Sequence, residues 1–248
     1  MKAIIVIPAR LASSRLPRKV LADIAGHSML WHVYQRCLQA KKVAEVHVAT
    51  DADEIMQEVA GWQGNAWLTD PSCASGTERI VSLLDKFSAD IIINVQGDQP
   101  LIDPSVVDAV VTAFESATPL PDIVTPCYQI HDQDSLLDPN VVKIVRRHDD
   151  YALYFSRHPI PYIRDDAQAE WINKTPFWGH VGIYGYQRKT LEDYPNLPSS
   201  PLEDMEKLEQ LRFLQAGKTI LTFETAHQAL SVDTSADLEK VKRLLNTG

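Results

Sequence analysis

Apolar and polar positions follow one pattern through the first half of the chain. Short runs of consecutive apolar residues are separated by segments with an apolar residue at every third or fourth position. Such runs predict buried strands, and the wider spacing predicts helices. The predicted strands are 3–7, 46–49, 66–68 and 91–95, and the predicted helices lie at 29–38, 53–62 and 80–87. Alternating strands and helices predict a mainly parallel sheet, because a right-handed crossover joins parallel neighbours.

The pattern changes in the second half of the chain. Segments 141–147 and 151–157 flank the turn-forming pair Asp149-Asp150, which predicts a β-hairpin. The next predicted strand is 180–186, and side chains alternate between its two faces. One face would carry Val181 and Ile183, and the other would carry His180, Tyr184 and Tyr186.

The remaining segments complete the predicted domain. Residues 164–178 have no apolar period and are predicted to form a loop. Helical spacing returns at 202–215, between Ser200-Pro201 and Gly217, and again at 237–245. No repeat or linker interrupts the chain, so we predict one α/β domain with an inserted hairpin region.

Charged residues are unevenly distributed along the chain. The 248 residues include 24 basic and 33 acidic side chains, a formal charge of −9, yet residues 1–22 contain five cations and no acid. An acidic chain is unsuited to bind nucleic acid or an anionic membrane over a broad surface. The basic first segment instead indicates a local anion site. Its cations are Lys2, Arg10, Arg15, Arg18 and Lys19.

Cysteine spacing and hydropathy indicate the cellular compartment in which the protein is expected. Cys37, Cys73 and Cys127 form neither a CxxC pair nor an even set, which suits a reducing compartment. The first apolar run ends at Pro8, and no run reaches the roughly 18 apolar residues that a membrane-spanning helix needs. We expect a cytoplasmic protein without membrane insertion.

The loop after the first strand, residues 8–19, is the first candidate site. Its sequence PARLASSRLPRK would bring guanidinium, ammonium and hydroxyl groups to the carboxyl end of a strand, where ligands bind in open α/β sheets. Such groups suit a triphosphate. The loop contains neither GxGxxG nor GxxxxGK(S/T), so neither a dinucleotide site nor a Walker loop is indicated. The alternative is a solvated basic loop.

Acidic residues mark a second candidate site. Asp98 follows strand 91–95 directly, where a carboxylate can hold Mg²⁺ against substrate phosphates. Nearby, Ser75 and Arg79 would place a hydroxyl and a guanidinium at a helix start. Asp233 precedes a capping-box-like sequence and could be a second metal ligand opposite Asp98. The alternatives are an ordinary turn at Asp98, a plain helix entry at Ser75, and a carboxylate at Asp233 that supports the cap.

Polar residues in the second half form a third candidate group. His180 and Tyr184 share a predicted strand face, and Arg157 ends the second hairpin strand. Glu206, Glu209 and Gln210 share a helix face, because they lie at positions i, i+3 and i+4. The alternatives are satisfied structural side chains, a surface cation and a solvated helix face. The eight histidines show no metal-ligand spacing.

Seven segments in a fixed order carry a resemblance that runs almost from end to end. They are IPARLASSRLPRKVL (7–21), ASGTER (74–79), NVQGDQPLI (94–102), YALYFSRHPIPY (151–162), HVGIYGY (180–186), LEDMEKLEQLR (202–212) and SVDTSADLEKV (231–241). The first and third occur loosely in other sugar nucleotidyltransferases. With the more specific later segments, the chain resembles the 3-deoxy-manno-octulosonate cytidylyltransferases, or CMP-Kdo synthetases.

The resemblance implies a Rossmann-like nucleotidyltransferase fold in a single domain. About 1–130 would be the nucleotide-binding part, about 131–215 the insert that binds the sugar acid and forms a homodimer, and 216–248 would return to the core. The implied reaction transfers CMP from CTP to the anomeric hydroxyl of 3-deoxy-D-manno-octulosonate (Kdo). It releases pyrophosphate and yields CMP-Kdo for lipopolysaccharide biosynthesis.

The resemblance also implies residue roles by motif position. Mg²⁺ would be held by Asp98 and Asp233, which with Lys19 would be the catalytic residues. CTP would be bound by Arg10, Arg15, Lys19, Ser75, Arg79 and Gln96. The 2-keto-3-deoxy sugar acid would be bound by Arg157, His180, Tyr184, Glu209 and Gln210.

Two positions depart from the family pattern, and other activities stay open. Arg18 stands where the family usually has glycine, and Gln99 stands where it commonly has Glu. The sugar could be 8-amino-Kdo or another sugar acid such as sialic acid. A non-catalytic nucleotide-binding module is a more distant alternative, which the presence of Lys19, Asp98 and Asp233 disfavours.

Overall fold

The first predicted strand lies inside a parallel sheet. The computed structural model describes residues 1–12, 16–228 and 230–246. In it β1 (Ala3–Ala9) pairs in parallel with β4 (Glu45–Thr50) and β6 (Ile91–Val95), and β5 (Ala66–Leu68) lies outside β4. All of the strands predicted in the first half are therefore confirmed, and their carboxyl ends meet at one edge of the sheet.

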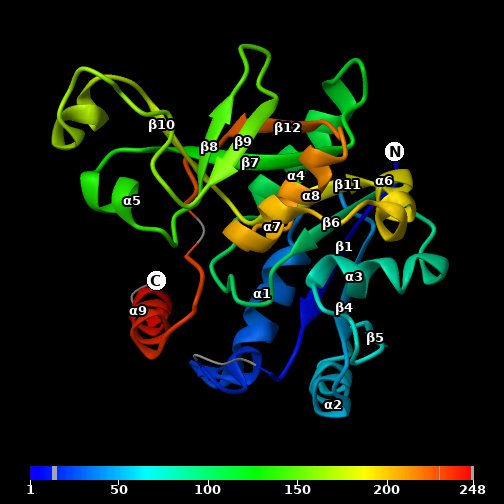
Figure 1. Ribbon diagram of the computed structural model, residues 1–248. Coiled ribbons are helices and arrows are strands. Elements are labelled where there is room, and N and C mark those ends of the chain that lie inside the picture. The colour runs from blue at the N-terminus through cyan, green and yellow to red at the C-terminus, as the bar shows by residue number, and fades with distance from the viewer. Residues whose placement is uncertain (13–15, 229, 247–248) are drawn as a thin grey trace.

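Helices cover both faces of this sheet (Figure 1). One face packs on α1 (Met29–Cys37), α2 (Asp53–Gly61) and α4 (Pro104–Ser116). The other packs on α3 (Gly76–Val81), α6 (Arg188–Asp193) and α8 (Gln210–Gln215). Alternate side chains of β1 enter these two cores, so that Ile5 belongs to the first and Ile4 to the second. The strand is apolar throughout because both of its faces are buried.

The second half of the chain extends the sheet with mixed directions. β11 (Ile183–Gln187) lies antiparallel between β6 and β7 (Ile123–Ile130). β12 (Ile220–Glu224) pairs in parallel with β7, and β10 (Phe177–His180) pairs antiparallel with it. Because β6 and β7 are both antiparallel to β11, the strands from β5 to β7 otherwise run in one direction. The largely parallel sheet is thus confirmed, although β7, β12 and α4 were not predicted.

The predicted hairpin is confirmed at the end of the sheet. β8 (Lys143–Arg146) and β9 (Ala152–Ser156) are antiparallel, and β8 also pairs with β10. Asp150 in the turn has a positive φ of 66°, a conformation that Asp tolerates better than most residues. Figure 1 shows the hairpin projecting from the rest of the sheet. Its predicted use in dimerisation stays a prediction.

Besides the helix predicted at 202–215, three segment predictions differ from the structure. The single strand predicted at 180–186 is interrupted between β10 and β11, although Val181 and Ile183 do face one core and Tyr184 and Tyr186 the other. The loop predicted at 164–178 contains a 3₁₀ turn at Gln168–Asn173, which buries Trp171 in a small cluster. The helix predicted at 80–87 is instead α3 followed by a 3₁₀ turn at Leu84–Lys86.

The helix predicted at 202–215 is broken in two. α7 (Pro201–Glu206) ends at Lys207, whose φ of 53° and ψ of 46° are left-handed. The Lys207 N–H bonds the Glu203 carbonyl oxygen at 2.7 Å, and the chain then turns so that Leu208 is buried before α8 begins. Residues 206, 209 and 210 therefore do not share the face of one helix, and the expectation that they do was wrong.

The last helix packs near the amino-terminal segment. α9 (Ser235–Asn246) begins with the predicted capping box, since Thr234 Oγ1 accepts from the Asp237 N–H and the Asp237 carboxylate accepts from the Thr234 N–H. Val232 and Val241 pack with Ile24 and Met29 beside the small hairpin of β2 (Asp23–Ile24) and β3 (His27–Ser28). The remaining short elements are α5 (Gln133–Leu137) and 3₁₀ turns at Lys19–Leu21 and Tyr194–Asn196. Among the helices of the described residues, none is both long and apolar enough to cross a bilayer.

Candidate active site

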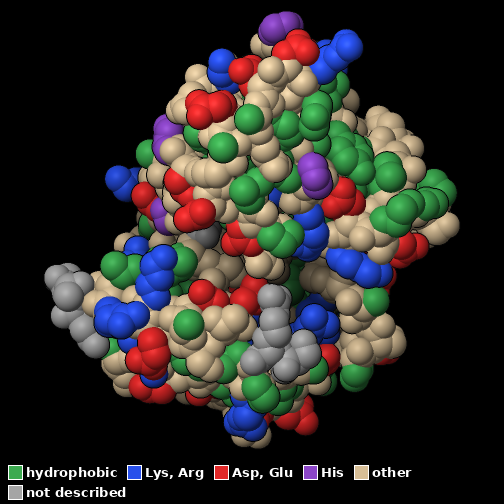
Figure 2. Space-filling view, turned by 60° about the vertical axis from the view of Figure 1, so that its left-hand side comes forward, with side chains coloured by type: hydrophobic (Ala, Val, Ile, Leu, Met, Phe, Trp, Pro, Cys, Tyr) green, Lys and Arg blue, Asp and Glu red, His purple; other side chains and the backbone are tan. Residues whose placement is uncertain are grey.

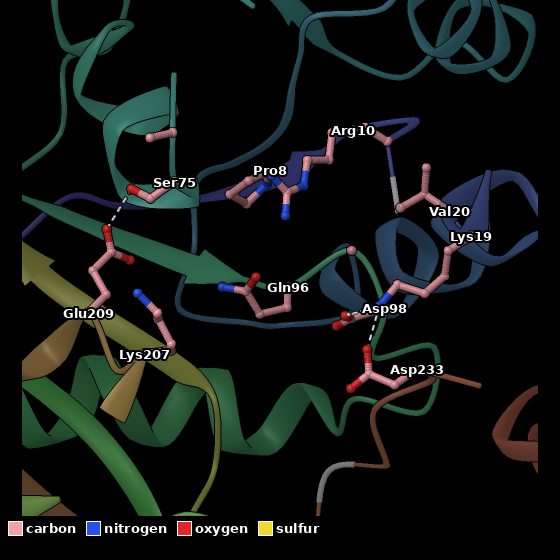
Figure 3. A pocket seen from close by; sticks show the side chains of 13 residues that line it. Pro8, Arg10, Lys19, Val20, Ser75, Gln96, Asp98, Lys207, Glu209 and Asp233 are labelled. Carbon is pink, nitrogen blue, oxygen red and sulfur yellow. Dashed lines mark hydrogen bonds and ion pairs between the residues drawn. The ribbon is translucent and has the colours of Figure 1, made fainter. Parts of the chain in front are cut away.

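A cavity of about 1020 Å³ opens where β1 and β6 end. Figure 2 shows a hollow in this face of the molecule with basic and acidic side chains around it. The cavity collects predicted site residues from both halves of the chain, which Figure 3 shows from close by. They are Arg10, Lys19, Ser75, Gln96, Asp98, Glu209 and Asp233. Arg15 lies outside the described residues.

Two glycines allow separate loops to meet at the end of β1. An added Cβ at Gly97 would lie 3.1 Å from the Pro8 carbonyl oxygen, and one at Gly76 would lie 3.3 Å from Pro8 Cγ. A side chain at either position would press against the same proline. The loop that carries Asp98 and the helix start that carries Ser75 therefore both approach the basic loop.

Lys19 joins the two predicted metal ligands at one end of the cavity. Its Nζ lies 2.7 Å from an oxygen of Asp98 and 2.9 Å from one of Asp233. Val232 N–H also bonds the Asp98 carbonyl oxygen at 2.9 Å, which brings the segment before α9 to the end of β6. Burial opposes the charge on Lys19, but Asp98 and Asp233 outweigh it and raise its pKa. Lys19 is therefore protonated at neutral pH.

The arrangement of Asp98 and Asp233 fits Mg²⁺. Both carboxylates contact the same nitrogen, so their oxygens converge from different segments of the chain. Mg²⁺ is usually held by one or two carboxylates together with waters and substrate phosphates. Residues 1–12, 16–228 and 230–246 contain no cluster of three or more His, Cys, Asp and Glu that could enclose a metal. A metal held by these two carboxylates would need further ligands from outside the described residues.

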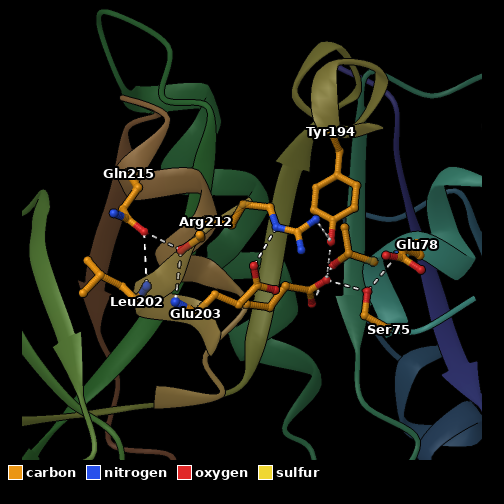
Figure 4. A network of polar contacts seen from close by, with 10 residues as sticks. Ser75, Glu78, Tyr194, Leu202, Glu203, Arg212 and Gln215 are labelled. Atoms are coloured by element: carbon orange, nitrogen blue, oxygen red, sulfur yellow. Dashed lines mark hydrogen bonds and ion pairs between the residues drawn. The ribbon is translucent and has the colours of Figure 1, made fainter. Parts of the chain in front are cut away.

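Glu209 occupies the opposite end of the cavity and is partly buried. Its carboxylate accepts hydrogen bonds from the hydroxyls of Ser75 at 2.6 Å, Thr77 at 3.0 Å and Tyr194 at 3.1 Å. Figure 4 shows Ser75 and Tyr194 pointing toward this part of the network from different segments of the chain. Burial raises the pKa of Glu209, and the three hydroxyls oppose that rise. Ser75 Oγ also accepts the Glu78 N–H and so caps α3. Glu209 thereby ties the start of α3 to the start of α8.

Arg212 extends this network away from the cavity. Its guanidinium donates to Tyr194 Oη at 3.2 Å and to the Glu203 carboxylate at 2.6 Å. Tyr194 is buried, and its hydroxyl is held between Arg212 and Glu209. Sequence reasoning identified Glu209 but missed Thr77, Tyr194 and Arg212, because only long-range contacts bring them together.

His180 and Tyr184 lie close together, as their shared strand face predicts, but outside the cavity lining. Their ring centroids are 5.1 Å apart. His180 Nε2 lies 2.9 Å from Thr125 Oγ1, and burial lowers the pKa of His180 to about 3. The imidazole is therefore neutral at physiological pH and is held by a hydroxyl.

Arg157 and Gln210 differ in how their polar atoms are satisfied. Arg157 donates from Nε to the Glu206 carbonyl at 2.7 Å, from Nη1 to the Pro139 carbonyl at 2.9 Å and from Nη2 to the Lys207 carbonyl at 3.4 Å. Gln210 is only 4% exposed, and its Nε2 has no hydrogen-bond partner within the described part of the chain. Such a buried donor is suited to a ligand oxygen, but neither Gln210 nor Arg157 is among the residues that line the cavity.

Arg79, Arg18 and Gln99 each lie in a different environment, and the last two are the residues that depart from the family pattern. Arg79 lines a smaller cavity of about 120 Å³ beside Ser75 and Arg10, but its guanidinium donates to Asp51 at 2.9 Å and to Thr69. Arg18 is exposed and forms an ion pair with Glu54, so it does not line the main cavity. Gln99 is buried, and its Oε1 lacks a partner among the described residues.

Comparison with known proteins places the chain in a family. The cytidylyltransferase family matches residues 4–220. The chain belongs to the cytidylyltransferases. This cytidylyltransferase is 46% identical over 244 residues to the 3-deoxy-manno-octulosonate cytidylyltransferase of Escherichia coli, covering 98% of this chain and 96% of the relative. It is 41% identical over 251 residues to the 8-amino-3,8-dideoxy-manno-octulosonate cytidylyltransferase of a Shewanella strain, with all of both chains covered.

Solved structures agree with this family assignment. The structure of CMP:2-keto-3-deoxy-manno-octonic acid synthetase complexed with CTP superposes with a TM-score of 0.93 and 45% identity. The alignment covers 100% of this cytidylyltransferase and 99% of that chain. A cytidylyltransferase from Leptospira borgpetersenii shares the fold alone, with a TM-score of 0.69 and 18% identity over 100% of this chain and 88% of its own.

Proposed function

We propose that this cytidylyltransferase transfers CMP from CTP to the anomeric hydroxyl of Kdo and releases pyrophosphate. The observation that carries the proposal is the single cavity that joins the Lys19, Asp98 and Asp233 cluster to the enclosed Glu209. The relatives named above act on Kdo or its 8-amino derivative, and they match nearly the full chain. The product CMP-Kdo would serve lipopolysaccharide biosynthesis.

The end of the cavity near Lys19 is the proposed triphosphate end. Arg10 and Lys19 would bind phosphate oxygens, with Arg15 as a further contact by motif position. Ser75 would contact another part of CTP, because its hydroxyl donates to Glu209 at the opposite end of the cavity. Asp98 and Asp233 would hold Mg²⁺, which when bound neutralises phosphate charge. Because little covalent protein chemistry is needed in phosphoryl transfer, these residues would act by positioning CTP and balancing charge. Gln96 and Arg79 would border the rest of the nucleotide.

The second half of the chain supplies the proposed sugar-acid end. Glu209 would accept hydrogen bonds from sugar hydroxyls with oxygen lone pairs that its three protein donors leave available. Gln210 would satisfy its buried amide on a sugar oxygen. His180 and Tyr184 would shape the wall behind the sugar, and Arg157 would border it. The anomeric hydroxyl would thereby be held facing the α-phosphate of CTP.

The substrate is tested by one parallel assay of pyrophosphate release. CTP and Mg²⁺ would be supplied with Kdo, with 8-amino-Kdo, with sialic acid, or without sugar. We expect turnover with Kdo and none without sugar or with EDTA. Faster turnover with 8-amino-Kdo would identify that sugar as the substrate, as the names of the Shewanella relatives suggest. No turnover with any 2-keto sugar acid would overturn the proposal.

We also propose that the chain is a cytoplasmic homodimer joined through the insert at 131–215. Four large apolar side chains of the insert are exposed, namely Leu137 at 43%, Leu153 at 55%, Tyr162 at 72% and Met205 at 73%. Burial against a second copy would remove this surface from water. Light scattering of the purified chain and of Leu153→Asp would test the proposal, with a monomeric wild-type chain as the contradicting result. The cytoplasm supplies CTP and suits the free cysteines.

A further inference from the structure

Lys207 lines the main cavity, although the sequence pattern does not single it out. Figure 3 shows its side chain rising from the chain break between α7 and α8 toward the space between Glu209 and Gln96. Within the described residues, no hydrogen bond or ion pair engages its ammonium group. A cation at a cavity wall without a protein partner is available to an anionic ligand.

The backbone at Lys207 is held in an unfavourable conformation. A left-handed φ of 53° is uncommon for a residue with a β-carbon. The conformation is held by the bond from Lys207 N–H to the Glu203 carbonyl, and by Arg157, which donates to the carbonyls of Glu206 and Lys207. Such strain persists where surrounding contacts enforce it, and it concentrates at functional sites. The break is what places Lys207 at the wall of the cavity.

The charges around the cavity show which anion Lys207 suits. At the far end, Lys19 is engaged by Asp98 and Asp233. At the near end, hydroxyl groups rather than Lys207 satisfy Glu209. Arg157, another cation on this side, uses all three of its nitrogens on backbone carbonyls. In a 2-keto sugar acid the carboxylate is bonded directly to the anomeric carbon, so it would lie between the sugar end of the cavity and the phosphates.

We propose that Lys207 binds the carboxylate of the sugar-acid substrate, and that Arg157 is the positioning residue that holds Lys207 in place. The assignment rests on the proposed function and identifies the group that selects an acidic sugar over a neutral one. An ammonium that pairs with a carboxylate favours binding of the acid without taking part in phosphoryl transfer.

Steady-state kinetics with Lys207→Met provide the first test. Met keeps the length of the side chain and a β-carbon but removes the charge. We expect the KM for the sugar acid to rise by about tenfold or more, with the KM for CTP within about twofold of wild type. Lys207→Arg should retain most of the affinity because it keeps the charge. Lys41→Met, at an exposed lysine outside the cavity, is the matched control.

A neutral substrate analogue separates charge pairing from shape. The carboxamide of the same sugar would be compared with the acid, using wild type and Lys207→Met. The penalty of about tenfold on the acid should fall below about twofold on the amide, since the amide has no charge to lose. Lys207→Gly, which relieves the backbone strain and also removes the cation, should behave like Lys207→Met.

The outcomes distinguish this assignment from the proposed function. An unchanged sugar KM in Lys207→Met, an equal penalty on acid and amide, or a rise confined to the KM for CTP would overturn the role of Lys207. Absence of turnover by the wild-type chain with every 2-keto sugar acid would overturn the proposed function, and the assignment with it. The unchanged KM for CTP serves as the check that each variant is folded.

Discussion

The two ends of the cavity hold their carboxylates in opposite ways. At one end, Asp98 and Asp233 face the Lys19 ammonium, and their side chains are 23% and 36% exposed. At the other end, the Glu209 carboxylate is enclosed by three hydroxyl groups. A cation balances the charge of Asp98 and Asp233, which are partly open to solvent. The charge of Glu209 is surrounded by neutral donors instead.

This difference separates an exchangeable site from a fixed one. A partly exposed ion pair contributes only about 0–1 kcal/mol to stability. The ion pairs of Lys19 can therefore be broken at little cost in free energy, which would free the two carboxylates for a metal and Lys19 for phosphates. A buried carboxylate is costly unless hydrogen bonds satisfy it. The three hydroxyl donors therefore hold the Glu209 carboxylate in one orientation. Mutations at the first end should change rate more than stability, and mutations at the second should do the reverse.

Asp98→Asn should give the largest effect on rate. Loss of the charge removes a ligand of the proposed metal, and we expect turnover to fall by about a thousandfold. The free energy of unfolding in urea should change by no more than about 1 kcal/mol, because the ion pair is partly exposed. Asp85→Asn, at an exposed carboxylate paired with its neighbour Lys86, is the control. Near-normal pyrophosphate release would remove Asp98 from the metal role.

Glu209→Ala should give the largest effect on stability. It leaves the hydroxyls of Ser75, Thr77 and Tyr194 without their shared acceptor, so we expect the free energy of unfolding to fall by about 2–3 kcal/mol. Glu209→Gln preserves the shape and one acceptor oxygen, and should lose less. Urea unfolding of both variants would measure the difference. A fully stable Glu209→Ala would show that this end of the cavity is not a fixed structure.

His180 should produce a pH dependence of stability rather than of rate. Burial lowers its pKa to about 3, against about 6.5 for a histidine in an unfolded chain. As the pH falls below about 6.5, the unfolded chain binds a proton that the folded chain does not, so the free energy of unfolding falls by about 1 kcal/mol per pH unit.

The same reasoning defines the His180 measurement. Urea unfolding near pH 7 and near pH 5 would be compared for wild type, His180→Gln and, at an exposed histidine, His148→Gln. His180→Gln should flatten the slope and His148→Gln should leave it unchanged. Equal slopes in all three chains would show that His180 is not held neutral.

Tyr194→Phe should give the smallest effect. It removes one of three donors to Glu209 and one of the two side-chain acceptors of Arg212, while the ring can still pack. We expect the free energy of unfolding to fall by about 1 kcal/mol, with the KM for CTP unchanged. Tyr162→Phe, at a hydroxyl on an exposed ring, is the control. A loss as large as that of Glu209→Ala would mean that Tyr194 holds the network by itself.

Local patterns predicted the nucleotide side of the fold and site well. The apolar runs at β1, β4 and β6 are continuous because these strands are buried on both faces. Their carboxyl ends meet at one edge, so residues after β1 and β6 were expected to converge, as Lys19 and Asp98 do. The capping box at Thr234 and Asp237 also lies within a few residues and needed no distant contact.

The sugar-acid side depended on contacts that local patterns do not contain. Leu202, Leu208 and Leu211 continue a helical spacing through the break, so periodicity predicts one helix. The break is instead held by Arg157, about fifty residues earlier in the chain, and by the burial of Leu208. Lys207 was missed for this reason. The strands β7 and β12 were missed because polar residues and Pro126 interrupt their apolar pattern.

The placement of β11 limits how the enzyme can move. β11 pairs with β6 along five residues, from Ile183 opposite Val95 to Gln187 opposite Ile91, and on its other edge it pairs with β7. β6, which leads to Asp98, and β11, which carries Tyr184, are thus hydrogen-bonded neighbours in one sheet, with no hinge between them. A movement that closed the cavity would therefore have to come from its rim, where the Lys207 turn lies, and not from the paired strands of its floor.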